Sequence, residues 1–464
     1  MTLRFGTDGV RGVANLDLTP ELVVALGRAA ARVLGGDCFL VGRDTRVSGP
    51  MLQAALSAGL TAEGADVADL GVLPTPGVAW ASATEMCPAA MISASHNPFP
   101  DNGIKFFAPG GRKLSDEAER RLEAELDRLL AAEGPGPPGP TGAELGRVGA
   151  HDGRERYAHA LGATLGGRRL DGLTVVVDCA HGAAYTVAPA VLSSLGVDVT
   201  VINDRPDGTN INLDAGSQHP EGLAQAVVDR GADAGLAFDG DADRVVAVDH
   251  TGAVVDGDQL IAICALDLRS RGLLAEDTVV VTVMANLGFR QAMHAHGITV
   301  VETKVGDRYV LEELERGRWS LGGEQSGHVI FRDLATTGDG ILTGLQVLDV
   351  MCRTGRRLHE LAQVMTRLPQ VLRNVTVADR HALDRAVELG AEVETIRRRM
   401  GDNGRVLVRP SGTEPVVRVM VEAVTLEEAE ATCAELCEAV SRSLAGPSGP
   451  PGPASAATAG AAGS

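Results

Sequence analysis

Three aspartates at alternate positions, Asp239, Asp241 and Asp243, form the most informative polar cluster in the sequence. Strand-like apolar runs flank them, so they are expected at the end of a strand, where open α/β sheets bind ligands. Three carboxylates this close repel one another unless a hard divalent cation neutralises them, which predicts oxygen-ligated Mg²⁺. A calcium-binding EF-hand loop does not fit, because Arg244 stands at its glycine position and His250 at its closing glutamate. A solvated acidic loop is the remaining alternative.

The stretch from residue 91 to 107 begins apolar and is then interrupted by Ser95. A hydroxyl at the end of a buried strand, facing a metal held by the aspartates, is placed to carry a phosphoryl group whose oxygen completes the metal shell. Lys105 is one of only three lysines, and cations such as Arg11 are expected to lower its pKa, which suits an acid or base. A Ser-His hydrolase is rejected because His96 is adjacent to Ser95 and no Gly-x-Ser-x-Gly elbow is present.

A second anion site is predicted at residues 409 to 415, "RPSGTEP", between two strand-like runs. Its arginine and hydroxyls, together with a glycine that lets backbone amides approach, are the parts of a phosphate cradle. A plain hairpin turn is the alternative, although a bare turn does not need so many anion-binding groups. The residues concerned are Arg409, Ser411, Gly412, Thr413 and Arg418. Another basic set, weaker as a signal, consists of Arg11, Arg43 and Arg46.

Residues 322 to 328, "GGEQSGH", place Glu324, Ser326 and His328 between glycines. Polar groups on a tightly turned backbone suit a polyhydroxylated ligand, whose orientation is set by hydrogen bonds. A polar loop with no ligand is the alternative.

Strand-like apolar runs alternate with segments of helical periodicity along the chain, which predicts the strand-helix-strand units of a mostly parallel sheet. These elements must position the residues above. Three segments repeat one unit, in which an apolar run with a polar end is followed by a helix and a second strand. These units begin at residues 39, 174 and 278. The region from 371 onward differs and predicts a small α+β domain. We therefore expect three related α/β domains with mixed sheets and a fourth domain of another kind.

Composition narrows the functional classes. The 464 residues carry a formal charge of −19, which argues against nucleic acid and anionic membranes as partners. With 44% hydrophobic but 3% aromatic residues, the core must be aliphatic. No secretory signal or membrane-spanning run is recognised, and seven scattered cysteines suggest reduced thiols. A cytoplasmic enzyme is expected.

The motifs "FGTDGVRG", "ISASHNPFPDNGIKFF", "FDGDADR", "LGGEQSGH" and "RPSGTEPVVRVMVEA", in this order, resemble the α-D-phosphohexomutase superfamily. The likeness is greatest to its bacterial branch that interconverts glucosamine 6-phosphate and glucosamine 1-phosphate for UDP-N-acetylglucosamine synthesis. It implies four domains around a central cleft, assigned to residues 1–150, 151–252, 253–366 and 367–444, with a disordered tail at 445–464. It also implies one Mg²⁺ per chain, a phosphoserine, a sugar 1,6-bisphosphate activator, and a monomer or homodimer.

The resemblance also implies a role for each matching residue. Ser95 corresponds to the phosphoserine, and the three aspartates with it to the metal ligands. The cationic acid-base and phosphate-stabilising set is Arg11, Lys105 and Arg244. The sugar readers are Glu324 and Ser326. The residues that bind the phosphate that is not transferred, called the phosphate grip below, are Arg409, Ser411, Gly412, Thr413 and Arg418.

Three other functions compete with this interpretation. A phosphoglucomutase or phosphomannomutase of the same superfamily shares the chemistry, although Asp307 stands where some phosphomannomutases have histidine. A non-catalytic sugar-phosphate sensor would keep the fold without the reaction. A Mg²⁺-dependent phosphatase would release phosphate to water.

Overall fold

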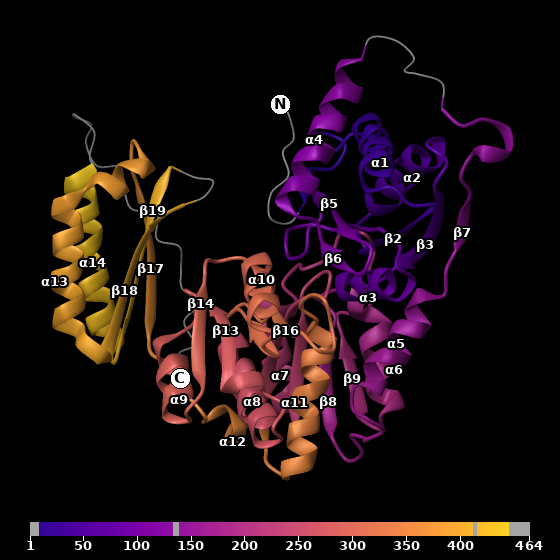
Figure 1. The fold of residues 1–464 in the computed structure, drawn as a ribbon. Coiled ribbons are helices and arrows are strands. Elements are labelled where there is room, and N and C mark those ends of the chain that lie inside the picture. The colour runs from indigo at the N-terminus through magenta and orange to yellow at the C-terminus, as the bar shows by residue number, and fades with distance from the viewer. Residues whose placement is uncertain (1–8, 133–138, 412–414, 445–464) are drawn as a thin grey trace. The chain divides into compact units, whose positions relative to one another are not determined.

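The computed structural model describes residues 9–132, 139–411 and 415–444, and Figure 1 shows its elements. By its internal contacts the chain divides into two compact units, which are described separately. Unit 1 comprises residues 1–285 and 293–364, and unit 2 comprises residues 286–292 and 365–464. The predicted disordered tail lies outside the described residues.

The described residues of unit 1 form three sheets that repeat one four-strand pattern. In each, three parallel strands lie side by side and an antiparallel strand closes one edge. In spatial order these strands are β3 (Asp66–Val72), β2 (Cys38–Arg43), β4 (Ala89–Ile92) and β5 (Asp101–Ala108); β9 (Asp198–Ile202), β8 (Thr174–Asp178), β10 (Ala234–Phe238) and β11 (Val245–Asp249); and β14 (Thr299–Thr303), β13 (Thr278–Thr282), β15 (Leu321–Gly323) and β16 (Val329–Phe331). The three predicted repeats are therefore confirmed.

Helices connect the parallel strands at matching places in the three sheets. In chain order these connecting helices are α2 (Gly49–Ala62) and α3 (Thr75–Glu85), α6 (Val187–Ser194) and α7 (Glu221–Arg230), and α9 (Leu287–Ala295) and α10 (Asp307–Gly317). Residues 287–292 of α9 belong to unit 2. Strand β13 reads Thr-Val-Val-Val-Thr and is buried throughout, as expected of a parallel strand covered on both faces. The alternation predicted from the sequence thus arises from strand-helix-strand units.

Additional elements extend this framework. Four short strands lengthen the first two sheets: β1 (Val10–Val13) and β6 (Arg112–Lys113) beside β5, β7 (Val148–Ala150) beside β3, and β12 (Val254–Val255) beside β11. The further helices are α1 (Pro20–Leu34), α4 (Asp116–Ala131), α5 (Gly153–Ala163), α8 (Gly257–Ser270), α11 (Gly340–Thr354) and α12 (Leu358–Ala362). A core of Leu26, Phe39, Leu56 and Leu122 joins α1, α2 and α4 to the first sheet.

A disulfide joins Cys38 to Cys87, so the prediction of reduced thiols is wrong for this pair. Cys38 begins β2 and Cys87 lies two residues before β4, and these strands are parallel neighbours. Their adjacent starting points bring the two Cα atoms to 6.1 Å. Linear spacing could not reveal this, because 49 residues separate the two cysteines. Cys179, Cys264, Cys352, Cys433 and Cys437 are free thiols.

The described part of unit 2 is built on one antiparallel sheet. The strands are β17 (Gln370–Thr376), β19 (Val416–Ala423) and β18 (Gly404–Pro410), with β19 in the centre. Helices α13 (Val387–Met400) and α14 (Leu426–Leu444) pack on this sheet, as Figure 1 shows, through a core that includes Val393, Val419 and Leu436. Thr425 caps α14 by accepting a hydrogen bond from the amide of Glu428. The predicted small α+β domain is present.

None of the helices described in either unit is long and apolar enough to cross a bilayer.

Candidate active site

Three of the predicted functional loops occupy the same place in the three repeated sheets. Ser95 lies in the loop from β4 to β5, the aspartates lie between β10 and β11, and Glu324 lies between β15 and β16. Each loop therefore joins the last parallel strand of its sheet to the antiparallel strand that pairs with it, β5, β11 or β16. Repetition of one fold places three chemically different loops at equivalent strand ends, where α/β sheets carry their ligands.

The Ser95 loop and the aspartate loop meet directly. Ser95 Oγ donates a hydrogen bond of 2.6 Å to Oδ2 of Asp239, and Ser95 is only 2% exposed. Oxygen atoms of Asp239, Asp241 and Asp243 all lie within 4.8 Å of one another. The structure thus brings together the hydroxyl and the three carboxylates that the sequence separates by more than a hundred positions.

Burial and mutual repulsion govern the protonation of these carboxyls. Burial, and next the charges of Asp243 and Asp241, raise the pKa of Asp239 well above its usual value. The pKa of Asp243 is also raised, by burial and by Asp241. Burial alone would raise the pKa of Asp241, but the charge of Lys105 and the hydrogen bond from Thr75 lower it. Such a cluster is electrostatically suited to a cation.

Oxygen atoms suited to a metal are present in this cluster. Asp241 Oδ1 and Asp243 Oδ1 are buried and accept no hydrogen bond from the described residues. An unsatisfied buried carboxylate oxygen is costly, and a hard divalent ion prefers such ligands. The donor set therefore fits the Mg²⁺ predicted from the sequence.

Lys105 lies on β5, and its Nζ is 2.9 Å from Oδ2 of Asp241 and 3.9 Å from Oδ2 of Asp243. Its ammonium therefore balances part of the negative charge of the aspartate loop. Arg11, opposite Gly103 across β1 and β5, also contributes charge that lowers the pKa of Asp241. The expectation that cations lower the pKa of Lys105 stays a prediction.

Arg244 follows the aspartates and faces the Ser95 loop. Its Nη1 lies 3.3 Å from Nδ1 of His96, and its Nε lies 3.8 Å from Oδ1 of Asp243. The same His96 nitrogen is 3.3 Å from Ser95 Oγ. Arg244 is therefore close enough to the serine to stabilise negative charge on a group carried there.

Gly240 allows the two loops to approach each other. A Cβ atom at Gly240 would lie 2.6 Å from the carbonyl oxygen of Ser95, which no real side chain tolerates. The sharp turn of the aspartate loop is made at Ala242, whose φ is +58°. The amide of Gly340 donates a 3.0 Å hydrogen bond to the Ala242 carbonyl and supports that turn.

The predicted sugar loop packs beside the strand that follows the aspartates. The amide of Val245 donates to the carbonyl of Gly327 at 3.1 Å. Glu324 accepts a 3.1 Å hydrogen bond from the amide of Gly306 and is half-buried, whereas Ser326 is exposed. Burial, with a contribution from Asp307, raises the pKa of Glu324. Polar groups from two segments of the third sheet therefore gather near the aspartate loop.

Asp307 is held between two basic side chains. Its carboxylate pairs with Lys113 and lies 3.4 Å from Nε2 of the buried His328. Lys113 belongs to β6, so this contact joins the first sheet to the third. Arg308 makes a second such link through ion pairs with Asp116 and Glu119.

The predicted phosphate grip lies in unit 2. Arg409 on β18 and Arg418 on β19 are directly opposite each other, and Ser411 is buried beside them with its amide bonded to the carbonyl of Val416. Like charges facing across a strand pair are unfavourable without an anion. Burial, followed by the charge of Arg418, lowers the pKa of Arg409. Gly412 and Thr413 lie outside the described residues.

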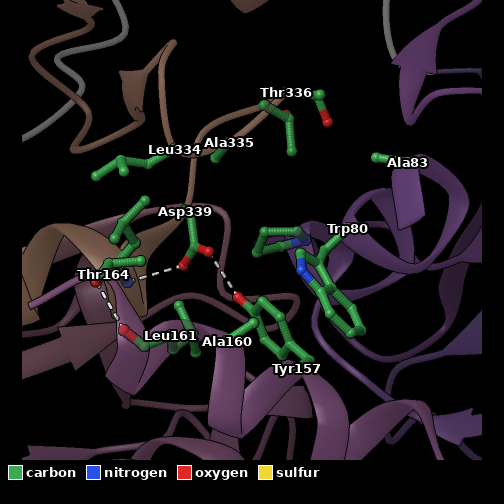
Figure 2. A pocket seen from close by; sticks show the side chains of 13 residues that line it. Trp80, Ala83, Tyr157, Ala160, Leu161, Thr164, Leu334, Ala335, Thr336 and Asp339 are labelled. Atoms are coloured by element: carbon green, nitrogen blue, oxygen red, sulfur yellow. Dashed lines mark hydrogen bonds between the residues drawn. The ribbon is translucent and has the colours of Figure 1, made fainter. Parts of the chain in front are cut away.

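A cavity of about 130 Å³, which the three aspartates do not line, lies between α3, α5 and residues 334 to 342 (Figure 2). Tyr157 Oη donates a 2.6 Å hydrogen bond to Oδ2 of Asp339 at its edge. Asp339 also accepts from the amide of Leu342 at the start of α11. Because Gly340 supports the aspartate loop, the wall of this cavity is linked to the candidate site.

Comparison with known proteins places this architecture in one family. Models of the four successive phosphoglucomutase/phosphomannomutase domains match the chain: alpha/beta/alpha domains I, II and III at residues 2–132, 155–252 and 256–368, and the C-terminal domain at 372–439. The chain belongs to the phosphoglucomutase/phosphomannomutase family. The resemblance to phosphohexomutases and the four-domain α/β fold are thereby confirmed.

Within this family, similar curated proteins are named phosphoglucosamine mutase. The one from Clavibacter michiganensis subsp. michiganensis is 54% identical over 444 residues, covering 95% of this chain and 99% of the relative. The one from Symbiobacterium thermophilum is 53% identical over 456 residues, covering 96% and 100%. A solved phosphoglucomutase/phosphomannomutase family protein from Burkholderia thailandensis has a TM-score of 0.79 at 26% identity, covering 95% of this chain and 98% of that one.

A more distant solved structure shares the fold alone. It is N-acetylphosphoglucosamine mutase from Aspergillus fumigatus, described in complex with GlcNAc-6P and magnesium. Its TM-score is 0.68 at 20% identity, and the match covers 96% of both chains.

Sequence analysis of this phosphoglucomutase/phosphomannomutase family member missed one residue at the site, Thr75, and assigned another, Arg46, a different role from the one the structure shows. Thr75, at the start of α3, donates its hydroxyl to Asp241 Oδ2 at 2.5 Å and its amide to the Asp241 carbonyl at 2.9 Å. No local pattern marks it, since its partner is 166 positions away. Arg46, expected in a phosphate-handling set, is instead wholly buried and bonded to the Ser95 loop.

Proposed function

We propose that this protein is a phosphoglucosamine mutase that interconverts glucosamine 6-phosphate and glucosamine 1-phosphate. The observation that carries the proposal is the hydroxyl of Ser95, buried and 2.6 Å from Asp239 within a cluster of three carboxylates. The phosphoglucosamine mutases that match nearly the whole chain at 53 to 55% identity support the choice of substrate.

Ser95 is the proposed phosphoryl carrier. The phosphoryl group leaves the serine oxygen for the free hydroxyl of the sugar phosphate, and one proton passes from that hydroxyl to the serine oxygen, so that a sugar 1,6-bisphosphate and a free serine result. The bisphosphate turns over and returns its other phosphoryl group to Ser95. Atoms balance over the cycle, because one phosphoryl group leaves the serine and one comes back. The same bisphosphate, supplied from outside, would phosphorylate an idle serine and act as activator.

The aspartates would hold Mg²⁺ through oxygens that include the unsatisfied Asp241 Oδ1 and Asp243 Oδ1. When bound, the ion withdraws charge from phosphoryl oxygens and so favours transfer. Lys105 and Arg11 carry positive charge beside the aspartates. The ammonium of Lys105 can give a proton to the oxygen that loses the phosphoryl group, and the resulting amine can take the proton of the attacking sugar hydroxyl. Arg244, close to His96 and Ser95, would balance charge on the phosphoryl group.

Binding of the sugar is assigned to two further loops. Glu324 and Ser326 would accept and donate hydrogen bonds to its hydroxyl groups. Arg409, Ser411, Gly412, Thr413 and Arg418 would grip the phosphate that is not being transferred. Two phosphate sites are required because one end of the sugar must be held while the other reacts.

Coupled assays with glucosamine, glucose and mannose 1-phosphates test the substrate. The proposal predicts the highest kcat/KM for the glucosamine compound. Greatest efficiency on the glucose or mannose compound would instead assign the chain to a phosphoglucomutase or phosphomannomutase activity. Measuring inorganic phosphate in the same reaction separates a mutase from a phosphatase, and a chain without any turnover would be a sensor.

We further propose that the enzyme serves UDP-N-acetylglucosamine supply in the cytoplasm as a monomer or homodimer, without nucleic acid or membrane partners. The net charge of −19 supports the absence of such polyanionic partners.

A further inference from the structure

Ser95 has an unusual backbone conformation. Its φ is +51°, in the left-handed region that a residue with a side chain adopts only at a cost of about 1–2 kcal/mol. Such a conformation persists only where the surroundings determine it. The hydroxyl direction toward Asp239 depends on this backbone, so the groups that hold Ser95 in place bear on its chemistry.

The carbonyl side of Ser95 is held by Arg46. The guanidinium is wholly buried and uses all five of its N–H groups. Its Nη2 donates to the carbonyls of Ser95 and Asn97, both at 2.9 Å. Its Nη1 donates to the carbonyls of Pro98 at 2.6 Å and Asp101 at 3.0 Å. The remaining N–H, on Nε, pairs with Asp44, so Arg46 fixes four successive points of the loop from one centre.

The fifth hydrogen bond of Arg46, to Asp44, connects it through Ser93 to the backbone amide of Ser95. Nε of Arg46 donates to Asp44 Oδ2 at 2.8 Å, and the hydroxyl of Ser93 donates to the same oxygen at 2.7 Å. Ser93 Oγ in turn accepts a 2.9 Å hydrogen bond from the amide of Ser95. Both backbone polar groups of Ser95 are therefore tied to one buried ion pair.

We propose that Asp44, Arg46 and Ser93 are positioning residues that aim the Ser95 hydroxyl for phosphoryl transfer. This inference rests on the proposed function. The three side chains are at most 1% exposed, so they hold the loop without touching the sugar phosphate. Misplacement of a reacting atom by about 1 Å can cost about 100-fold in rate, while binding through other loops is unaffected. Replacing any of these three side chains is therefore expected to lower kcat and to leave KM nearly unchanged.

Ser93→Ala is the sharpest test, because it removes one hydroxyl and leaves the ion pair in place. Ser82→Ala is the matched control, since Ser82 is equally buried in the same domain and its hydroxyl lies within hydrogen-bond distance of the carbonyls of Cys87 and Ala108, away from the Ser95 loop. For each variant we would measure Tm, the kcat and KM of isomerisation, and the single-turnover rate at which glucose 1,6-bisphosphate phosphorylates the protein.

The expected result for Ser93→Ala is a loss of about 10- to 100-fold in kcat and in the single-turnover rate, with KM within about threefold of wild type. Its Tm should fall no further than that of Ser82→Ala. Equal kcat in the two variants would overturn the inference. Arg46→Lys keeps the charge but not the five hydrogen bonds, so its kcat should fall further than that of Ser93→Ala. A wild-type kcat in Arg46→Lys would also overturn the inference.

The proposed function fails in a different way. If Ser95→Ala keeps its isomerase activity, the phosphoserine mechanism itself is wrong. If Ser95→Ala is inactive while Ser93→Ala turns over like Ser82→Ala, the mechanism stands and only the positioning role is refuted.

Discussion

The hydroxyl of Ser95 and the carboxylate of Asp239 lie 2.6 Å apart across 144 residues of sequence. They belong to equivalent loops of two repeated sheets, and each loop is closed by an antiparallel strand, β5 or β11. Asp239 is also the member of the aspartate cluster whose pKa is raised well above normal by burial and by its two neighbours. The serine therefore faces a carboxylate whose ionised form would be stabilised by a nearby positive charge.

Asp239→Asn should weaken the response to Mg²⁺ while stabilising the metal-free protein. Asparagine stays neutral, so the variant avoids the burial and the repulsion from Asp243 and Asp241 that disfavour the ionised form of Asp239, and Tm in EDTA should rise above that of wild type. Mg²⁺ at 100 times its Kd should stabilise wild type by about 2.7 kcal/mol and the variant by much less. Thermal unfolding with and without Mg²⁺ measures both effects. Asp229→Asn, at an exposed aspartate, is the control, and equal Mg²⁺ stabilisation of all three proteins would contradict the prediction.

Asp339 should make stability depend on pH between about 4 and 6. Burial raises its pKa to about 6, so the folded state binds this proton more tightly than the unfolded state does. Stability from this group is complete below pH 4 and is lost as pH rises toward 6, by up to about 3 kcal/mol. Asp339→Asn stays neutral throughout.

Urea unfolding at several pH values checks this sign. The unfolding free energy of wild type minus that of Asp339→Asn should decrease from pH 4 to 6. A constant or increasing difference would contradict it. Tyr157→Phe, which removes the hydrogen-bond donor that Figure 2 shows beside Asp339, should lower stability most above pH 6, where the carboxylate is ionised.

Arg418→Ala should raise KM for sugar phosphates about 10- to 100-fold, the cost of losing a hydrogen bond to a charged group. Removing one of two like charges that face each other across β18 and β19 should change Tm little. Steady-state kinetics and Tm check both parts. Arg373→Ala, at an exposed position on β17 of the same sheet, is the control. An unchanged KM in Arg418→Ala would remove this residue from the proposed phosphate grip.

The sequence predicts the site best where residues with reactive or metal-binding side chains directly follow an apolar strand. Asp239 and Ser95 follow apolar runs, and their residue types indicate a cation and a carrier, so both the repeated fold and the meeting of these two residues could be anticipated. Arg46 could not be interpreted in this way, because its partners are backbone carbonyls about fifty positions further on. The motif "GRDTR" does not distinguish an arginine that binds an anion from a buried arginine that holds a loop in place.

Contacts that depend on packing between distant segments were beyond the sequence. Thr75 supports Asp241 from the start of α3, 166 positions away, and Lys113 pairs with Asp307 across 194 residues. The disulfide between Cys38 and Cys87 depends on the order of β2 and β4 within the sheet, which an odd number of scattered cysteines does not indicate.

Intact-mass analysis with peptide mapping, after incubation with glucose 1,6-bisphosphate and Mg²⁺, tests the central claim most directly. We predict one phosphoryl group per chain, located on Ser95 within the peptide containing residues 91 to 107, and none on Ser95→Ala. A phosphate on any other residue, or an unmodified protein that still isomerises glucosamine phosphate, would contradict the account.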